Sequence, residues 1–137
     1  MLGENIRLIN AMDKYDLWDF IGPIESKSST FYPQIDVASD DKNYFVIAEV
    51  PGMLKESIKI DLEDNTLTLS GTKTNESADE NTTYLSVERS VGKFVRSFKL
   101  PEDVDTEKIT ATMDLGILTV TLPKDEKLNK NKKIDIT

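Results

Sequence analysis

Short segments in which apolar and polar residues alternate occupy the middle of the chain and constrain its fold most strongly. Residues 58–62 read Ile-Lys-Ile-Asp-Leu, and residues 66–71 read Thr-Leu-Thr-Leu-Ser-Gly. A period of two places every second side chain on the same face of a β-strand. The Glu-Asp-Asn sequence at residues 63–65 favours a tight turn, so the pattern predicts a β-hairpin.

Further β-rich segments are bounded by Pro, Gly or Asp at residues 44–50, 94–100, 109–113 and 117–122. Many short strands without a helical period indicate an all-β, immunoglobulin-like antiparallel β-sandwich. Residues 102–108 have room for one helical or 3₁₀ turn. We predict a sandwich domain over residues 31–123, a flexible and partly disordered N-terminal arm of residues 1–30, and a C-terminal extension of residues 124–137.

The charge balance and the missing residue types exclude several function classes. The chain carries 25 acidic and 17 basic residues, no cysteine and no histidine. An acidic protein lacks the basic face that nucleic acids require. Without Cys and His, disulfides, the usual zinc sites and His-based triads are excluded. No apolar run is long enough to span a bilayer, and no signal-peptide pattern is present, so we expect a cytoplasmic protein without a membrane partner.

The sequence gives little indication of a set of residues that could form a catalytic site. Paired acids occur at residues 40–41, 63–64 and 102–103, all within predicted turns where carboxylates are normally solvated. The six glycines are scattered and form no phosphate-binding loop. We therefore expect no catalytic residue, no metal and no cofactor.

An isolated strand is predicted within a long polar interval that begins at residue 74. Residues 84–88 read Tyr-Leu-Ser-Val-Glu, with almost no apolar residue before them in the interval. A lone strand leaves its N–H and C=O groups unpaired. Two interpretations remain open, namely pairing at an edge of the chain's own sheet and strand exchange with a second subunit.

Arg96 interrupts an otherwise apolar face of its predicted strand. It shares that face with Phe94, Phe98 and Leu100. A charge in such a position is unfavourable unless it is paired or reaches water. Either the guanidinium extends into solvent from an edge strand, or it forms an ion pair at an interface with Glu88 or with an acid that follows Asp79.

The C-terminal extension combines a charged linker with an apolar end. Residues 124–133 are polar and are expected to be mobile. In an extended chain, Ile134 and Ile136 point to the same side. Burying each would contribute roughly 1.5–3 kcal/mol before ordering costs, so a single tail binds a groove weakly and many tails bind through avidity. The alternative is that this segment is the last strand of its own domain.

The N-terminal arm is rich in apolar side chains that show only a weak helical stripe. It either packs onto its own domain or inside an oligomer, or it binds other apolar surfaces. The residues concerned are Leu2, Ile6, Ile9, Met12, Leu17, Trp18, Phe20 and Ile21.

In their order and spacing, these segments resemble the small heat-shock protein (alpha-crystallin) family. Residues 31–37 resemble its opening strand, and residues 50–53 (Val-Pro-Gly-Met) its Pro-Gly element. Residues 111–120 are similar to its A-x-x-x-n-G-v-L-t-V signature, with Leu115 at a position that is usually polar. Residues 134–136 match its I-x-I motif. Residues 88–94 and 18–20 are closest to the plant, yeast and bacterial branch.

The resemblance implies an ATP-independent holdase that forms homodimers and larger homo-oligomers and binds unfolded clients through its arm. The implied dimer interface combines the exchanged segment, the partner's opening strand and the family's interface arginine: Tyr84, Leu85, Ser86, Val87, Glu88, Phe31, Ile35 and Arg96. The tail residues Ile134 and Ile136 would dock in a neighbour's groove near Ile58, Ile60, Ile109 and Ala111. The alternative is a monomeric docking module of the CS-domain co-chaperone type, which has the same sandwich.

Overall fold

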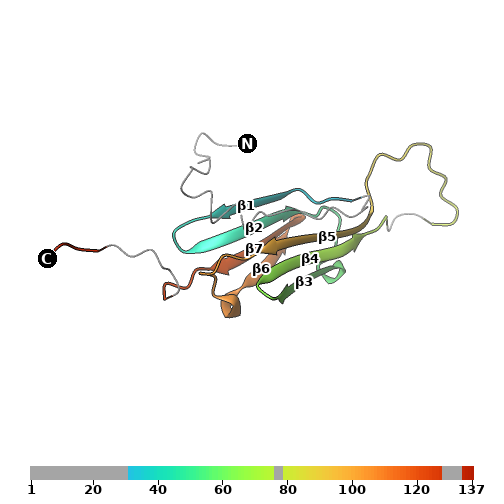
Figure 1. Ribbon diagram of the computed structural model, residues 1–137. Helices are drawn as coiled ribbons and strands as arrows, with labels where there is room; N and C mark the ends of the chain where they lie inside the picture. Colours follow the sequence, from blue (N-terminus) through green and yellow to red (C-terminus); the bar gives the residue numbers. More distant parts are fainter. Residues whose placement is uncertain (1–30, 76–78, 128–133) are drawn as a thin grey trace, which may run out of the picture.

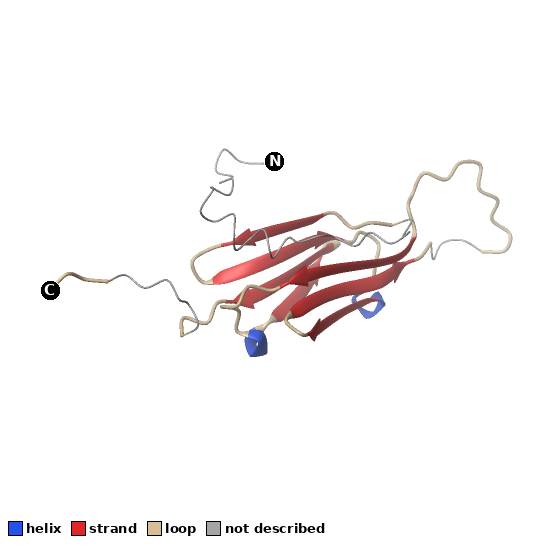
Figure 2. Cartoon of the chain, in the orientation of Figure 1, coloured by secondary structure: helices blue, strands red, loops and turns tan. Residues whose placement is uncertain are grey.

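The computed structural model describes residues 31–75, 79–127 and 134–137 (Figure 1). In that part of the chain, seven strands form two antiparallel sheets that pack face to face. One sheet has the strand order β1-β2-β7-β6, and the other has the order β3-β4-β5. The prediction of an all-β antiparallel sandwich is therefore confirmed. Figure 2 shows that the helical content of this region is limited to short single turns.

The strands are β1 (Ile35–Ser39), β2 (Asn43–Glu49), β3 (Ile58–Glu63), β4 (Thr66–Lys73), β5 (Gly92–Lys99), β6 (Thr110–Asp114) and β7 (Ile117–Pro123). The 3₁₀ turns are η1 (Lys55–Ser57) and η2 (Thr106–Lys108). Most predicted strands are present with ends shifted by one or two residues, and η2 lies in the predicted interval. The opening strand begins only at Ile35, and residues 84–88 form no strand within the described chain.

The core lies between the sheets and is built from the alternating positions. In β2 the buried residues are Tyr44, Val46 and Ala48, and in β4 they are Leu67 and Leu69. Every second residue of β7, beginning with Leu118, is also buried. Full burial of such a side chain contributes roughly 1.5–3 kcal/mol, so these three strands provide much of the hydrophobic stabilisation.

The predicted β3–β4 hairpin turns through two residues with positive φ, Asp64 at 49° and Asn65 at 60°. Two such residues in succession are typical of a type I′ turn, and Asp and Asn tolerate this conformation. The Asn65 side chain donates to the Leu100 carbonyl at 2.9 Å, and the Leu100 N–H donates to the Asn65 carbonyl at 2.9 Å. The turn is thereby fixed to the end of β5.

The end of the domain does not coincide with the end of β7. Residues from 124 onward were expected to be mobile, but Lys124 forms an antiparallel bridge with Val104. The Asp125 N–H also donates to the Asp103 carbonyl at 2.7 Å. These hydrogen bonds fix the root of the extension to the sandwich, so the expected mobility at Lys124 and Asp125 is wrong.

The β6–β7 turn places a leucine in an unfavourable conformation. Leu115 has a φ of 52° and a side chain that is 94% exposed. Left-handed backbone costs a non-glycine residue about 1–2 kcal/mol, and Asn tolerates it better than Leu.

We expect Leu115→Asn to raise the free energy of unfolding by about 1 kcal/mol and the melting temperature by roughly 4–8 °C. Scanning calorimetry at fixed protein concentration measures both. Leu115→Val, which is β-branched, should lower the melting temperature. A leucine that proves as stable as asparagine would show that the turn is not strained.

Candidate functional site

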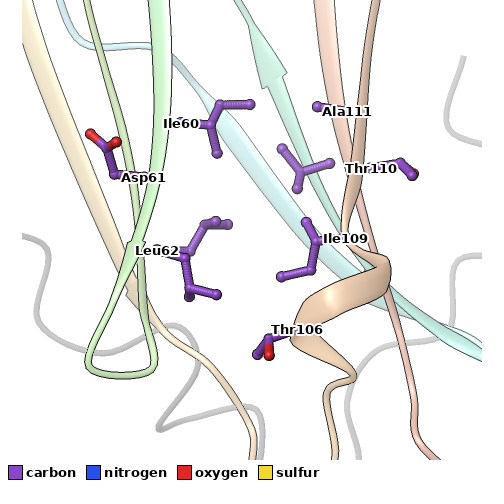
Figure 3. Close-up of a pocket in the computed structure, with 9 residues that line it drawn as sticks. Ile60, Asp61, Leu62, Thr106, Ile109, Thr110 and Ala111 are labelled. Carbon is purple, nitrogen blue, oxygen red and sulfur yellow. The ribbon is translucent and has the colours of Figure 1, made fainter.

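An open groove separates the edges of the two sheets where β3 faces β6. Figure 3 shows Ile60 and Leu62 on one side of it and Ile109 and Ala111 on the other. The groove has a volume of about 270 Å³. Because β3 and β6 are edge strands of different sheets in the described chain, the gap between them is not closed by backbone pairing.

The walls and floor of this groove are mostly apolar. Leu67 and Val120, both fully buried, line its base. Ala111 is paired with Val120 in the β6–β7 ladder, and its small side chain leaves room above it. The Asp61 carboxylate points away from the opposite wall (Figure 3) and lies 3.5 Å from Lys59 Nζ. The groove therefore suits apolar side chains of a few carbon atoms.

The structure brings three of the four predicted groove residues together, namely Ile60, Ile109 and Ala111. Ile58 is half-buried against the core and does not line the groove. Sequence reasoning missed the other lining residues, among them Leu62 and Thr106. Leu62 continues the alternation of Ile58 and Ile60, so that signal was available, whereas nothing in the sequence marks Thr106.

The two tail isoleucines are exposed and do not occupy the groove of their own chain. Ile134 is 82% exposed and Ile136 is 100% exposed. Residues 134–137 form no strand within the described chain, so they do not extend its own sheets. The motif is thus available to a partner.

The predicted exchanged segment also lies in solvent. Leu85 is 97% exposed, and Tyr84 and Val87 are exposed as well. The Asn75 side chain donates to the Tyr84 hydroxyl at 2.7 Å across the loop. Pairing of this segment with an edge of its own sheet does not occur among the described residues. Strand β1 pairs with β2 on one side and presents its other edge.

Arg96 does not extend into solvent, and that interpretation is wrong. Its side chain is only 5% exposed, and Nη1 donates to the Pro33 carbonyl at 2.8 Å. The guanidinium carbon lies 4.3 Å from the centre of the Tyr32 ring. Nε has no hydrogen-bond partner, and burial lowers the pKa of the guanidinium. No described carboxylate lies within ion-pair distance of it, so the ion pair across an interface stays a prediction.

The predicted opening strand, residues 31–37, has one end in the core and the other in the edge strand β1. Phe31 is buried, and its ring contacts that of Phe94 edge-on with centroids 5.7 Å apart. Lys73 Nζ lies 4.5 Å from the Phe31 ring centre. The Phe31 side chain therefore belongs to its own core, and the place of its backbone in a dimer interface stays a prediction. Ile35 lies in β1 and is half-buried.

The apolar positions predicted in the arm, from Leu2 to Ile21, lie outside the described residues. Within residues 31–75, 79–127 and 134–137, no three acidic residues converge as a metal site would require. None of the described helices is long and apolar enough to cross a membrane.

Residues 36–137 match the family described as "Hsp20/alpha crystallin family". The chain belongs to this family. The match continues through residues 134–136, the I-x-I motif. Small heat shock proteins of this family are stress-response chaperones and not enzymes.

Individual relatives agree with the family match. The "17.4 kDa class I heat shock protein" of Oryza sativa subsp. japonica is 39% identical, covering 96% of this small heat shock protein and 97% of the relative. The structure of "Heat shock protein 16.0 from Schizosaccharomyces pombe" superimposes with a TM-score of 0.70 at 32% identity, covering 92% and 91% of the two chains. A small heat-shock protein from Xylella fastidiosa gives 0.67 at 25% identity, covering 80% and 99%.

We expect Arg96→Ala to lower the free energy of unfolding by about 3 kcal/mol. The substitution removes the stacking on Tyr32 and leaves the buried Pro33 carbonyl without a donor. Arg96→Met preserves most of the volume, so its expected loss is only roughly 1–2 kcal/mol. Urea unfolding at fixed protein concentration measures both. If Arg96→Met were as stable as the parent protein, the guanidinium contacts would contribute nothing net.

Proposed function

We propose that this small heat shock protein is an ATP-independent holdase that keeps unfolding proteins from aggregating and assembles into homo-oligomers in the cytoplasm. The observation that carries the proposal is the presence, on one chain, of an open apolar groove and of two exposed isoleucines, Ile134 and Ile136, near the end of the tail. Exposed apolar groups of this kind indicate interaction sites. Their complementary chemistry favours association between copies.

Dimers form by strand exchange in this proposal. Residues 84–88 are exposed, and the outer edge of β1, which no described strand pairs, offers backbone donors and acceptors. Adding the segment to that edge in a partner subunit satisfies both sets of groups. Arg96 then stabilises the strand that receives the partner's segment, because its guanidinium donates to the Pro33 carbonyl just before β1.

The dimers associate through their tails. Ile134 and Ile136 project from the same side of an extended segment and fit the apolar groove of a neighbouring dimer. One docked tail yields only a few kcal/mol after ordering costs, whereas several tails per assembly bind through high effective concentration. Heating therefore releases tails individually before the sandwich unfolds.

Clients bind to the N-terminal arm. Its eight singled-out apolar residues include the only tryptophan of the chain, Trp18. Aromatic and flexible apolar side chains adapt to the varied apolar patches that an unfolding protein exposes. The net charge of −8 keeps the resulting complexes in solution.

We expect Ile134→Ala combined with Ile136→Ala to reduce the oligomer to dimers, because truncation removes most of the apolar surface that enters the groove. Native mass spectrometry gives the subunit count. Asp135→Ala is the matched control, since its side chain points the other way and should leave the assembly intact. Ala111→Glu should produce the same dimers from the groove side. An unchanged oligomer in both variants would contradict tail docking.

The dimers of the tail variant also allow a test of strand exchange. Leu85→Pro removes a backbone donor from the exchanged segment and should convert those dimers to monomers. Leu85→Thr, which retains the donor, should leave them dimeric. If both variants remained dimeric, the dimer interface would lie elsewhere in the chain.

Holdase activity is tested by light scattering from a thermolabile enzyme heated without nucleotide. We expect the scattering to fall as the ratio of subunits to client chains rises, because exposed apolar surface on the client is covered before it aggregates. Replacing Leu17, Trp18 and Phe20 with serine should abolish most of this protection without changing the oligomer. Asp16→Asn with Asp19→Asn, in the same segment, is the control. Full protection by the serine variant would show that the arm is not the client site.

A further inference from the structure

Lys124, the first residue after β7, is held by contacts on one side of the chain. Its backbone N–H donates to the Lys42 carbonyl at 2.8 Å. Its Nζ donates to the Asp40 carbonyl at 2.7 Å and lies 4.6 Å from the centre of the Tyr44 ring. The side chain therefore connects the root of the extension to the β1–β2 turn and to the strand that follows.

The opposite side of the same root is bonded to the loop before η2. Lys124 bridges Val104, and the N–H groups of Asp105 and Asp125 donate to the carbonyls of Pro123 and Asp103 at 2.8 and 2.7 Å. The Tyr44 hydroxyl donates to an Asp103 carboxylate oxygen at 2.9 Å, which joins the two sides beneath the root. The extension thus leaves the domain between two loops that are themselves connected.

The partners of the Lys124 ammonium are chiefly neutral. It binds a carbonyl oxygen and a ring face, whereas the nearby Asp40 carboxylate accepts from the N–H groups of Lys42 and Asn43 at 2.8 and 2.7 Å. Those two donors are the main reason that the pKa of Asp40 is lowered, and the charge of Lys124 contributes less. The attachment is therefore directional and only weakly sensitive to salt.

We propose that Lys124 is a positioning residue for the tail: its side chain fixes the direction in which the tail leaves the domain. This inference rests on the proposed docking of the tail in a neighbour's groove. With Asp125 fixed, nine Cα steps separate it from Ile134, which span at most about 32 Å. Loss of the Nζ contacts leaves the backbone bonds of Lys124 and Asp125 in place, so it frees the direction of the tail without lengthening this span.

A fixed root has two effects on the assembly. It keeps the tail isoleucines at a high effective concentration near one groove, because a directed tether samples less space. It also limits the angles at which two dimers can be joined. Without the side-chain attachment, tails leave their grooves more often and connect dimers in more than one arrangement.

The test compares full-length Lys124→Gln with Lys127→Gln, a charge-matched control whose side chain is exposed three residues further on. Native mass spectrometry of mixed isotopically labelled and unlabelled oligomers gives the subunit distribution and the exchange rate. We expect Lys124→Gln to exchange subunits about three- to tenfold faster and to broaden the distribution, since one hydrogen bond and one cation–π contact are lost. Lys127→Gln should match the parent protein.

Lys124→Arg restores a cation that can donate to the carbonyl and stack on Tyr44, so it should return the exchange rate to within about twofold of the parent value. Circular dichroism of each variant checks that the sandwich is folded. Equal exchange rates for Lys124→Gln and Lys127→Gln would overturn the inference alone. If the double alanine variant at Ile134 and Ile136 also left the oligomer intact, the proposed tail docking would itself be wrong.

Discussion

Unpaired backbone groups at the edges of the two sheets are the constraint on which the rest of this structure depends. A two-layer sandwich that does not close into a barrel keeps edge strands, and each edge presents N–H and C=O groups that must find a partner or water. Here no described strand pairs with the outer edge of β1, while β3 and β6 face each other across an apolar groove. The chain also carries two exposed segments with suitable chemistry, residues 84–88 and 134–136. Residues 84–88 are suited to backbone pairing with the β1 edge, and the isoleucines of residues 134–136 are suited to apolar contact with the groove.

The alternating pattern was sufficient to predict the strands, whereas the groove was predicted from the family resemblance. Ile60 and Ile109, which the resemblance assigns to the groove, both lie at the opening between the sheets. Alternation describes one strand at a time, however, and does not say which strands become neighbours. The family resemblance supplied that information for Ala111, whose value lies in its small size opposite β3 and not in any local pattern.

Contacts between distant residues account for the predictions that failed. Arg96 binds a carbonyl 63 positions away in the sequence, and Lys124 binds one 84 positions away. A backbone carbonyl accepts a hydrogen bond whatever its side chain, so neither partner leaves a signature in the sequence. The burial of Phe31 likewise depends on where the chain enters the sandwich. Whether a charged residue is buried, and whether a polar linker is ordered, therefore depends on tertiary contacts that the local sequence does not show.

The groove is bounded by strands of different sheets, so its width is a measure of how closely the two layers are apposed. Anything that binds there in the native state and not in the unfolded chain raises the stability of the sandwich, and by reciprocity a loosened sandwich binds it less tightly. In the proposed assembly, each docked tail is therefore a ligand whose affinity depends on the thermal state of its host domain. In such an arrangement the temperature response of the assembly needs no separate sensor, because it is inherent in the spacing between the layers.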